Sequence, residues 1–434
     1  MAEVQAFRGW RYDLSQVGSF AGVTAPPYDV INQEQQNDLY KQHPCNVVRL
    51  ILNREEPGDD GSDARYRRAA GFLKHWREEG ILQQERESAL YVYHQEFEWE
   101  GTKYVRRGFL GRLRIEEFGT GSVYPHELTM SGPKADRLAL LNACRTNLSP
   151  IFGLYPDSDS AVQNPLETAI TSITPCEATD ELGVLHRVWA VTDRAAISQV
   201  VEQLANKPIF IADGHHRYET ALNYRNQLRE SGDITDETAA GNFVLMHFVG
   251  MNDPGLAILP THRLLSGLPS LSADDLRSAL EGSFEIEDVG TGDSAAQDAW
   301  EMIEADGGQN LLAFGTNDGR WQLARMTDSA AMKQLAPDQS ETWQGLGVSI
   351  LHRLVFEKLV TDRFPDADIS CRYVHLLDEV TTAQKDNSCQ LACLVAPAGI
   401  ELVEEIASKL EKMPQKSTYF YPKLLSGLVF NSLE

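Results

Sequence analysis

An apolar run that stops abruptly at an acid and a glycine most constrains how this chain can fold. Residues 209–212 are all apolar, and the sequence Asp-Gly-His-His-Arg follows them at Asp213–Arg217. From Tyr218 onward, apolar residues recur at helix spacing. The pattern predicts a buried strand, a sharp reversal at Gly214, and a helix for which Asp213 is placed as the N-cap residue.

The predicted start of this helix is suited to an anion. A helix directs its first N–H groups and the positive end of its dipole at whatever lies before its first turn. Here Arg217 adds a guanidinium group, which matches phosphate oxygens. A solvated strand–turn–helix junction is the alternative interpretation. Four polar residues on one corner favour a chemical role.

The overall charge limits the classes of partner. The chain has 434 residues, which exceeds one ordinary domain and predicts two lobes or one domain with a large addition. With 39 basic and 63 acidic residues the net charge is −24, whereas a nucleic-acid surface requires a basic stripe. We expect small-molecule substrates and no nucleic-acid partner, because a small anion needs only a local basic pocket.

The chain carries no sign of a membrane or of an oxidising compartment. The first residues lack the charged and apolar regions of a signal peptide, and no run approaches the roughly 18 apolar residues of a membrane span. The six cysteines are scattered without a Cys-x-x-Cys pair. These features predict a cytoplasmic protein without a membrane partner, and they leave the oligomeric state open.

Local patterns also predict parts of the architecture. Residues 90–97 and 104–110 read as two strands of a hairpin around a Glu-Gly turn at 100–101. Ser272 is placed to cap a new helix. The segment from about 290 to 339 is the least patterned, and we expect it to be the most peripheral.

Motifs for the common nucleotide-binding folds are missing. The sequence contains no GxxxxGK[ST], no GxGxxG between a strand and a helix, no GxSxG and no HExxH. Four polar corners remain: His126 and Glu127 with Lys134 and Arg137; Asp213 to Arg217; Thr261, His262 and Arg263; and Lys416, Ser417 and Thr418. One or two carboxylates among many cations and hydroxyls suit phosphoryl transfer, in which catalysis is mainly positioning and charge neutralisation.

Five motifs together resemble a widespread bacterial family catalogued as domain of unknown function 1015. They are Ala25–Ile31, His43–Arg49, Pro125–Glu127, Asp213–Tyr218 and the tail Lys416–Phe420. This family is related to the ParB/sulfiredoxin-like free serine kinases, which convert L-serine to O-phospho-L-serine. The resemblance implies an α/β (mixed α+β) fold with a ParB/sulfiredoxin-like catalytic core. It places an N-terminal part at 1–88, the core at 89–265, and a C-terminal α+β lobe that closes on the site at 266–434.

The resemblance also implies roles for individual residues. In the related kinases the Asp-Gly-His-His-Arg segment binds the donor phosphate and the glutamate of a Pro-His-Glu segment is the base. By motif match, Glu127, Asp213 and His215 are catalytic, and Asp213 is the expected ligand of Mg²⁺. Donor-phosphate binding is expected at His216, Arg217, Lys134, Arg137, Lys416, Ser417 and Thr418. Substrate binding is expected at His126, Thr261, His262, Arg263, Tyr28 and Asp29.

The shorter archaeal kinases use ADP, whereas the long bacterial relatives resemble pyrophosphate-dependent serine kinases. The chain has no adenine-site signature, which agrees with a small inorganic donor. Our hypothesis is therefore a pyrophosphate-dependent L-serine kinase, a phosphotransferase with an alcohol group as acceptor. An ADP- or ATP-dependent kinase or a phosphatase of another small hydroxyl metabolite, and a non-catalytic ParB-like binding protein, remain alternatives. A sulfiredoxin-like redox enzyme would need a cysteine where His215 stands.

Overall fold

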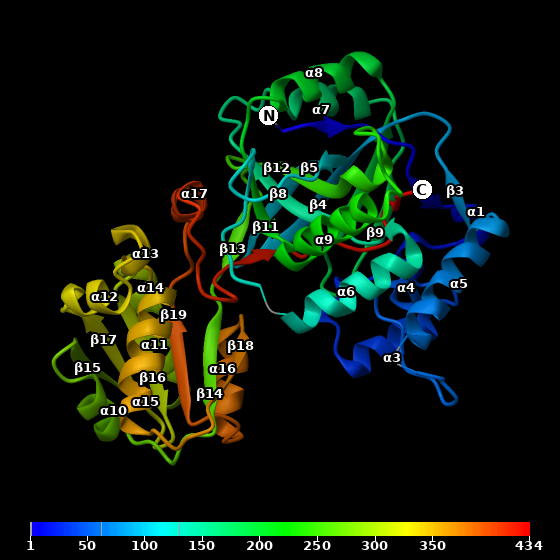
Figure 1. Ribbon diagram of the computed structural model, residues 1–434. Helices are drawn as coiled ribbons and strands as arrows, with labels where there is room; N and C mark the ends of the chain where they lie inside the picture. Colours follow the sequence, from blue (N-terminus) through cyan, green and yellow to red (C-terminus); the bar gives the residue numbers. More distant parts are fainter. Residues whose placement is uncertain (1, 62, 130) are drawn as a thin grey trace. The chain divides into compact units, whose positions relative to one another are not determined.

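The computed structural model describes residues 2–61, 63–129 and 131–434, and they divide into two compact units (Figure 1). Unit 1 consists of residues 1–125, 129–257 and 422–434, and unit 2 of residues 126–128 and 258–421. Both units mix helices and strands, so the predicted mixed α/β class is confirmed.

Apart from residues 126–128, which group with unit 2, the division differs from the expected boundary at residue 265 in two places. Strand β14 (His262–Ser266) lies between β18 (Ser370–Val374) and β19 (Leu391–Val395) in the sheet of unit 2. The last residues, 422–434, belong with unit 1. Both of these unit boundaries are set by pairing between strands that are far apart in the sequence. Local sequence patterns cannot predict such pairing.

Unit 1 is built on a nine-stranded sheet in the order β6-β11-β8-β12-β5-β4-β10-β9, with β1 paired to β5. Its strands are β1 (Val4–Gln5), β4 (Leu90–Trp99), β5 (Thr102–Arg114), β6 (Val123–Tyr124), β8 (Ile151–Tyr155), β9 (Cys176–Thr179), β10 (Leu185–Val191), β11 (Ile209–Asp213) and β12 (Phe243–Gly250). The predicted hairpin is confirmed, since β4 and β5 pair with Trp99 opposite Thr102. Glu100 and Gly101 both have positive φ, as a tight two-residue turn requires.

The helices of unit 1 surround this sheet, with α7 beside α8 and α6 beside α9 (Figure 1). They are α1 (Leu14–Val17), α2 (Phe20–Val23), η1 (Tyr28–Val30), α3 (Gln33–Gln42), α4 (Val48–Ile51), α5 (Ala64–Glu78), α6 (Ser131–Cys144), α7 (Asn164–Ile170), α8 (Arg194–Leu204), α9 (His215–Ser231) and η2 (Ala240–Asn242). Side chains from α8 and α9 join those of β11 and β12 in one apolar core. This core fixes the end of β11 against the start of α9.

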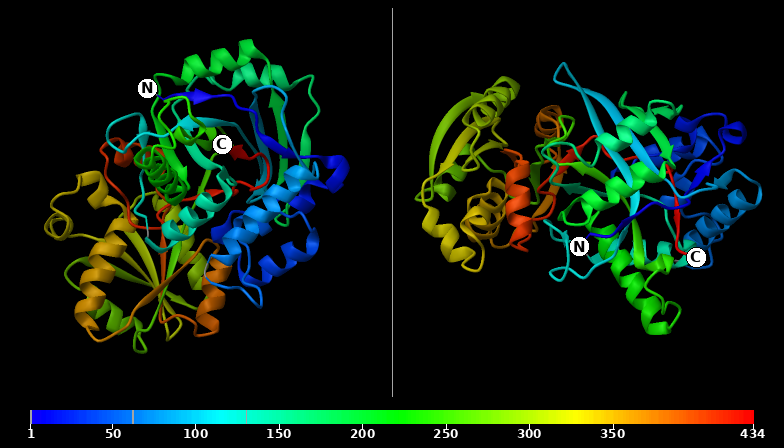
Figure 2. Two further views of the ribbon diagram at one scale, coloured as in Figure 1. Left: turned by 45° about the vertical axis from the view of Figure 1, so that its right-hand side comes forward. Right: turned by 90° about the horizontal axis from the view of Figure 1, so that it is seen from above.

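The C-terminal segment runs back through unit 1 (Figure 2, red). Ser426 bridges to Ala25, and Phe430 bridges to Trp10. Strand β21 (Asn431–Ser432) then pairs with β7 (Thr146–Asn147), and a further pair joins β2 (Trp10–Tyr12) to β3 (Leu82–Gln84). Residues near the two ends of the sequence are therefore paired within unit 1.

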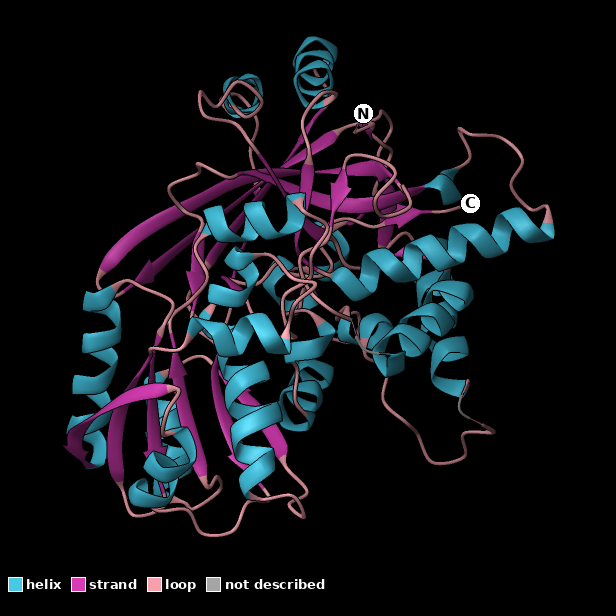
Figure 3. Cartoon of the chain, turned by 60° about the vertical axis from the view of Figure 1, so that its left-hand side comes forward, coloured by secondary structure: helices cyan, strands magenta, loops and turns pink. Residues whose placement is uncertain are grey.

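Unit 2 is a six-stranded antiparallel sheet in the order β15-β17-β16-β19-β14-β18, with helices on both faces (Figure 3). Its further strands are β15 (Phe284–Thr291), β16 (Leu311–Thr316) and β17 (Arg320–Met326), and β13 (Ala257–Leu259) and β20 (Tyr419–Tyr421) form a separate pair. One face is covered by α10 (Ala273–Leu280), α12 (Ser329–Leu335), α13 (Glu341–Gly345), α14 (Gly347–Ser349), the π-helix η3 (Ile350–Val360) and α17 (Ile400–Ser408). The other is covered by α11 (Gly292–Asp306) and α16 (Leu377–Lys385), and α15 (Thr361–Arg363) follows η3.

The expectation that residues 290–339 are peripheral is wrong. This segment contains α11, β16 and β17, and β16 lies in the interior of the sheet. Strand β16 is buried along its whole length, so it lacks the alternation of a half-exposed strand. Helix α11 buries mainly small alanines, which give a weak apolar pattern. The predicted helix cap at Ser272 is confirmed, because its side chain accepts a hydrogen bond from the N–H of Asp275.

No helix among the described residues is both long enough and apolar enough to cross a membrane.

Candidate functional site

The corner between β11 and α9 is made by a left-handed glycine. Strand β11 ends at Asp213, Gly214 has φ 93° and ψ 28°, and α9 begins at His215. Gly214 is the N-cap residue and α9 has no side-chain cap, so the placement of Asp213 as N-cap was wrong. A Cβ atom at residue 214 would lie 2.9 Å from the guanidinium carbon of Arg217. Only glycine allows Arg217 to lie this close to the turn.

Instead of capping the helix, Asp213 holds two cations. The Nζ atom of Lys423 lies 2.7 Å from Asp213 Oδ1, and Arg217 donates from Nη2 to Asp213 Oδ2. Arg217 also donates from Nη1 to the carbonyl of Pro150. The side chains of Arg217 and Lys423 are only 12% and 14% exposed. We call Arg217 and Lys423 the cation pair. Asp213 is the carboxylate that holds both of them.

Buried polar side chains fix the backbone that carries Lys423. Gln95 donates from Nε2 to the Lys423 carbonyl at 2.9 Å, and Arg106 donates to the carbonyl of Pro422. Arg106 is fully buried and also donates to Gln95. Burial lowers the pKa of Arg106 to about 10, which still leaves the guanidinium charged at neutral pH. Lys423 is therefore placed by the core and not by a flexible tail.

The sequence analysis missed Lys423. It assigned a phosphate-binding role to Lys416, Ser417 and Thr418, which come shortly before it in the same segment. The available signal was the Pro-Lys pair at 422–423, directly after three aromatic residues. Neither spacing nor periodicity indicates that this lysine reaches a carboxylate 210 positions earlier.

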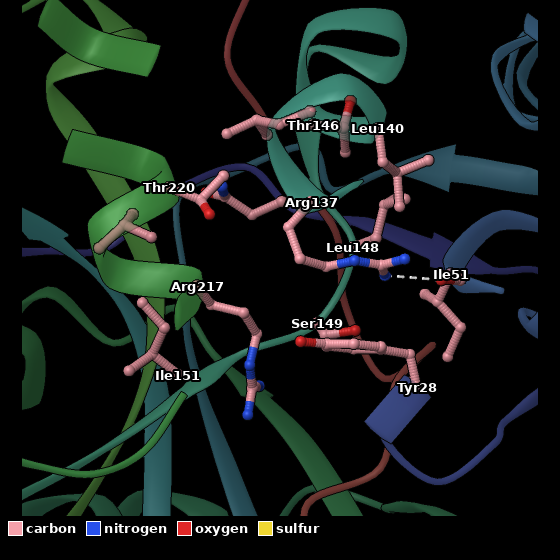
Figure 4. Close-up of a pocket in the computed structure, with 13 residues that line it drawn as sticks. Tyr28, Ile51, Arg137, Leu140, Thr146, Leu148, Ser149, Ile151, Arg217 and Thr220 are labelled. Atoms are coloured by element: carbon pink, nitrogen blue, oxygen red, sulfur yellow. Dashed lines mark hydrogen bonds between the residues drawn. The ribbon is translucent and has the colours of Figure 1, made fainter. Parts of the chain in front are cut away.

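A small pocket adjoins Arg217. Its polar lining includes Tyr28, Arg137, Ser149 and Thr220, and apolar side chains such as Ile51 supply much of the rest (Figure 4). The guanidinium of Arg137 lies 3.9 Å from the centre of the Tyr28 ring and donates to the Ile51 carbonyl at 2.7 Å. The pocket volume of about 60 Å³ gives room for roughly four to six water molecules. Figure 4 shows the hydroxyl end of Tyr28 directed toward the side of Arg217.

Other predicted residues of unit 1 lie near this corner with different partners. Lys134 on α6 pairs with Glu219 on α9, with its Nζ 2.8 Å from Glu219 Oε2. The structure thus gives Lys134 an internal acidic partner, and its phosphate-binding role stays a prediction. Asp29 is exposed beside Tyr28. His215 is buried in the first turn of α9, and His216 is half-buried next to it.

Within unit 2 the structure joins Glu127 to the Lys416 segment. The backbone N–H of Lys416 donates to Glu127 Oε1. Met413 donates to the His126 carbonyl at 2.8 Å, so the two segments also pair through their backbones. Lys416 has φ 56°, a left-handed conformation that is strained for a residue with a side chain. This conformation directs the Lys416 N–H to the carboxylate.

The neighbouring predicted residues complete the same cluster. His126 Nε2 lies 2.9 Å from Thr418 Oγ1, and Ser417 donates to the Pro414 carbonyl at 2.6 Å. Arg263, which is fully buried, donates to the carbonyls of Lys416 and Thr261. Two of the four predicted polar corners, 261–263 and 416–418, and the His126–Glu127 half of a third therefore meet in unit 2, whereas Lys134 and Arg137 of that third corner lie in unit 1. The fourth lies in unit 1, and the expectation that Lys416 lies near it stays a prediction.

His262 has the position of a core residue. Its side chain is 1% exposed and its ring packs edge-on against Trp300 with 4.9 Å between the centroids. Burial lowers the pKa of His262 to about 3, so the ring is neutral. Thr261 next to it is also buried, with Oγ1 3.4 Å from His375 Nδ1. The substrate-binding role predicted for both residues has no support from these positions and stays a prediction.

The residues around Asp213 do not suit a resident magnesium ion. Mg²⁺ needs oxygen ligands in near-octahedral geometry, and each carboxylate oxygen of Asp213 already contacts a cationic side chain. Throughout residues 2–61, 63–129 and 131–434, no group of three or more His, Cys, Asp or Glu side chains could hold a metal ion. Binding of Mg²⁺ by Asp213 stays a prediction.

The fold and the corner define a mixed α/β protein with cationic side chains gathered at the start of a helix. The chain belongs to the family described as "Protein of unknown function (DUF1015)", whose model matches residues 4–349. A comparison with curated proteins found no match.

Several solved structures are similar to the chain at low identity. A variant of free serine kinase in complex with AMP is 11% identical, with a TM-score of 0.36 over 69% of this chain and 84% of that one. A conserved hypothetical protein from Pyrococcus furiosus is 12% identical, with a TM-score of 0.35 and coverages of 70% and 89%. C-terminally truncated SbnI from Staphylococcus aureus is 10% identical, with a TM-score of 0.32 and coverages of 73% and 85%.

Proposed function

We propose that the chain is a phosphotransferase that moves a phosphoryl group from pyrophosphate to L-serine, giving O-phospho-L-serine and phosphate. The observation that carries the proposal is the convergence of Arg217 and Lys423 on Asp213 at the start of α9. The acceptor and the donor come from the family resemblance, and the cation pair supplies the chemistry that a phosphate donor requires.

The cation pair is suited to transition-state charge. In phosphoryl transfer, negative charge spreads over the oxygens of the moving group, and catalysis depends on positioning and neutralisation. Arg217 offers a planar fork and Lys423 a compact ammonium group, while α9 adds the positive end of its dipole. Since Asp213 holds both cations in place beforehand, little side-chain freedom is lost when a phosphate binds.

The size of the neighbouring pocket favours an inorganic donor. A volume of about 60 Å³ accommodates a phosphate-sized group beside Arg217, whereas sites for drug-sized ligands occupy roughly 300–1,000 Å³. Arg137 and Tyr28 stack across this pocket and restrict its width. These dimensions support pyrophosphate in preference to a nucleotide, whose base would need more room than this pocket has.

Glu127 is proposed as the general base. It would accept the proton of the serine hydroxyl while the serine oxygen forms a bond to phosphorus and the bridging P–O bond of pyrophosphate breaks. The hydrogen bond from the Lys416 N–H holds one carboxylate oxygen of Glu127. This hydrogen bond orients the carboxylate, and the family resemblance assigns the role of base to Glu127.

The test is a donor panel with the full chain. Purified protein is incubated with L-serine, Mg²⁺ and one of pyrophosphate, ADP or ATP, and phosphoserine is measured by mass spectrometry. Phosphoserine formed with pyrophosphate alone is the expected result. Formation with ADP or ATP alone would overturn the donor assignment, and no phosphoserine with any donor would overturn the serine kinase function.

A further inference from the structure

Among the residues that the structure describes, two arginines make no contact with a partner. In the part of the chain that the structure describes, every other arginine makes a hydrogen bond, an ion pair or a contact with an aromatic ring, whereas Arg86 and Arg194 make none. Both side chains belong to exposed residues of unit 1. Unpaired arginines are unexpected in a protein with 63 acidic and 39 basic residues.

The two unpaired arginines line the same pocket. It lies between the residues just before β4 and the start of α8, and its volume is about 510 Å³. Arg8 lines it as well and donates only from Nε, to the Glu85 carbonyl at 2.9 Å. The other polar lining comes from hydroxyl groups and one acid: Ser88, Thr192, Ser198 and Glu87. We call this the arginine pocket.

The arginine pocket shares no lining residue with the pocket beside Arg217. The three guanidinium groups that line the pocket repel one another, and the single carboxylate there does not balance their charge. An anion that enters between them relieves this repulsion. The guanidinium fork matches the oxygens of phosphate and carboxylate groups. The volume falls in the range of small-molecule sites.

We infer that the arginine pocket binds a small oxyanion with two or more negative groups, at a site separate from the cation pair at Asp213. Phosphate groups and carboxylate groups share this chemistry, so the experiment uses one probe of each kind. Helix α8, which begins at the pocket, contributes Ala196, Val200 and Leu204 to the core that also contains β11. A ligand held here therefore stabilises the folded unit 1.

The test separates this pocket from the proposed catalytic corner. The background protein carries Arg217→Ala and Lys423→Met, which remove the cation pair, and binding of tripolyphosphate and of citrate is measured by calorimetry at low salt. Adding Arg86→Gln and Arg194→Gln should weaken binding of at least one probe by about tenfold or more. A matched control adds Arg67→Gln and Arg229→Gln, which remove two arginines that pair with Asp60 and Glu237 elsewhere in unit 1.

Weaker probe binding in the Arg86/Arg194 variant, but not in the control, supports the site. The probe whose binding is weakened shows whether the pocket prefers phosphate or carboxylate groups. Three results would overturn it: no binding of either probe to the background protein, unchanged binding in the Arg86/Arg194 variant, or equal weakening in the control. Circular dichroism and the melting temperature without ligand should be unchanged, because both arginines are exposed and unpaired. The outcome is independent of whether the chain phosphorylates serine.

Discussion

Lys423 Nζ lies 2.7 Å from Asp213 Oδ1, although 210 positions separate the two residues in the chain. The same carboxylate accepts a hydrogen bond from Arg217, so residues from β11, α9 and the C-terminal segment meet at one point. An anionic ligand would find two cations already placed there. This relationship makes the C-terminal segment part of the proposed donor site.

Replacing Lys423 by Met should weaken donor binding. The change keeps the length of the side chain and removes its charge, so the KM for pyrophosphate should rise by about tenfold or more while the KM for serine changes little. Steady-state kinetics with each substrate varied in turn measures both values. Lys41→Met, which removes an exposed lysine paired with Asp38, is the matched control and should behave as wild type. An unchanged pyrophosphate KM in a folded Lys423→Met protein would remove Lys423 from the donor site.

Arg217 should also act on the donor and not on the acceptor. Arg217→Ala removes the fork that contacts Asp213 and Pro150, and we expect donor binding to weaken more than serine binding. Arg217→Lys should recover only part of the loss, because an ammonium group cannot make two parallel hydrogen bonds. Calorimetric titration with pyrophosphate and with serine compares the two ligands. If serine affinity fell while pyrophosphate affinity held, the two subsites would have to be exchanged.

Gly214 offers a paired test of backbone strain and side-chain position. Gly214→Ala places a Cβ 2.9 Å from the Arg217 guanidinium in a left-handed conformation with φ 93°. Gly232→Ala at the other end of α9 imposes the same kind of strain at φ 78°, with nothing within 4 Å of the new Cβ. Each variant should lose about 1–2 kcal/mol of stability, measured by urea unfolding. Only Gly214→Ala should also raise the pyrophosphate KM, because only its Cβ meets Arg217. A similar rise in both variants would mean that backbone strain in α9, and not the position of Arg217, changes the KM.

Glu127→Gln should keep the fold and remove the base. The amide oxygen can still accept the hydrogen bond from the Lys416 N–H, so the melting temperature should stay near that of wild type. The amide cannot take a proton from serine, and kcat should fall on the order of 10²-fold or more. A normal kcat in the folded variant excludes Glu127 as the base.

Buried His262 should make the protein less stable in acid. Burial lowers the pKa of its ring from 6.5 to about 3, so between these values the unfolded chain binds a proton that the folded chain does not. Its contribution to stability is therefore complete above about pH 6.5 and falls as the pH drops toward 3, by up to about 1.4 kcal/mol per pH unit.

His262→Phe keeps the edge-on contact with Trp300 and removes the titrating group. The free energy of unfolding, measured by urea at pH 7.5, 6 and 5, should fall less steeply with acid in this variant than in wild type. Replacement of the exposed His75 by Gln is the control and should leave the slope as in wild type. Equal slopes in wild type and His262→Phe would contradict the buried neutral ring.

Local sequence patterns predicted those features of the fold that depend on interactions between residues close together in the chain. The β4–β5 hairpin, the cap at Ser272 and the strand–glycine–helix corner follow from turn chemistry and apolar periodicity, and the structure contains all three. The role of Asp213 could not be predicted in this way. Its carboxylate bonds to Lys423, which Arg106 and Gln95 hold in place through backbone carbonyls. Only the tertiary fold brings these residues together.

The grouping of the other polar corners has the same cause. Glu127, Arg263 and Lys416 are far apart in sequence, and hydrogen bonds to and from Lys416 bring them into one cluster of unit 2. The composition of these segments predicted that polar residues would gather at a site. It could not indicate which of the four polar corners would lie in the same structural unit. His262 shows the opposite case, because a polar residue within a motif became a buried neighbour of Trp300.

The stoichiometry of phosphate products tests the central claim most directly. The full chain is incubated with pyrophosphate, L-serine and Mg²⁺, and the reaction is followed by ³¹P NMR. Serine phosphorylation at the cation pair predicts that O-phospho-L-serine and orthophosphate appear in equal amounts, and that both form much more slowly in Lys423→Met, with pyrophosphate below its KM, and in Glu127→Gln. Orthophosphate without phosphoserine would show hydrolysis of pyrophosphate, and an unchanged pyrophosphate signal would show no reaction; either result would contradict the account.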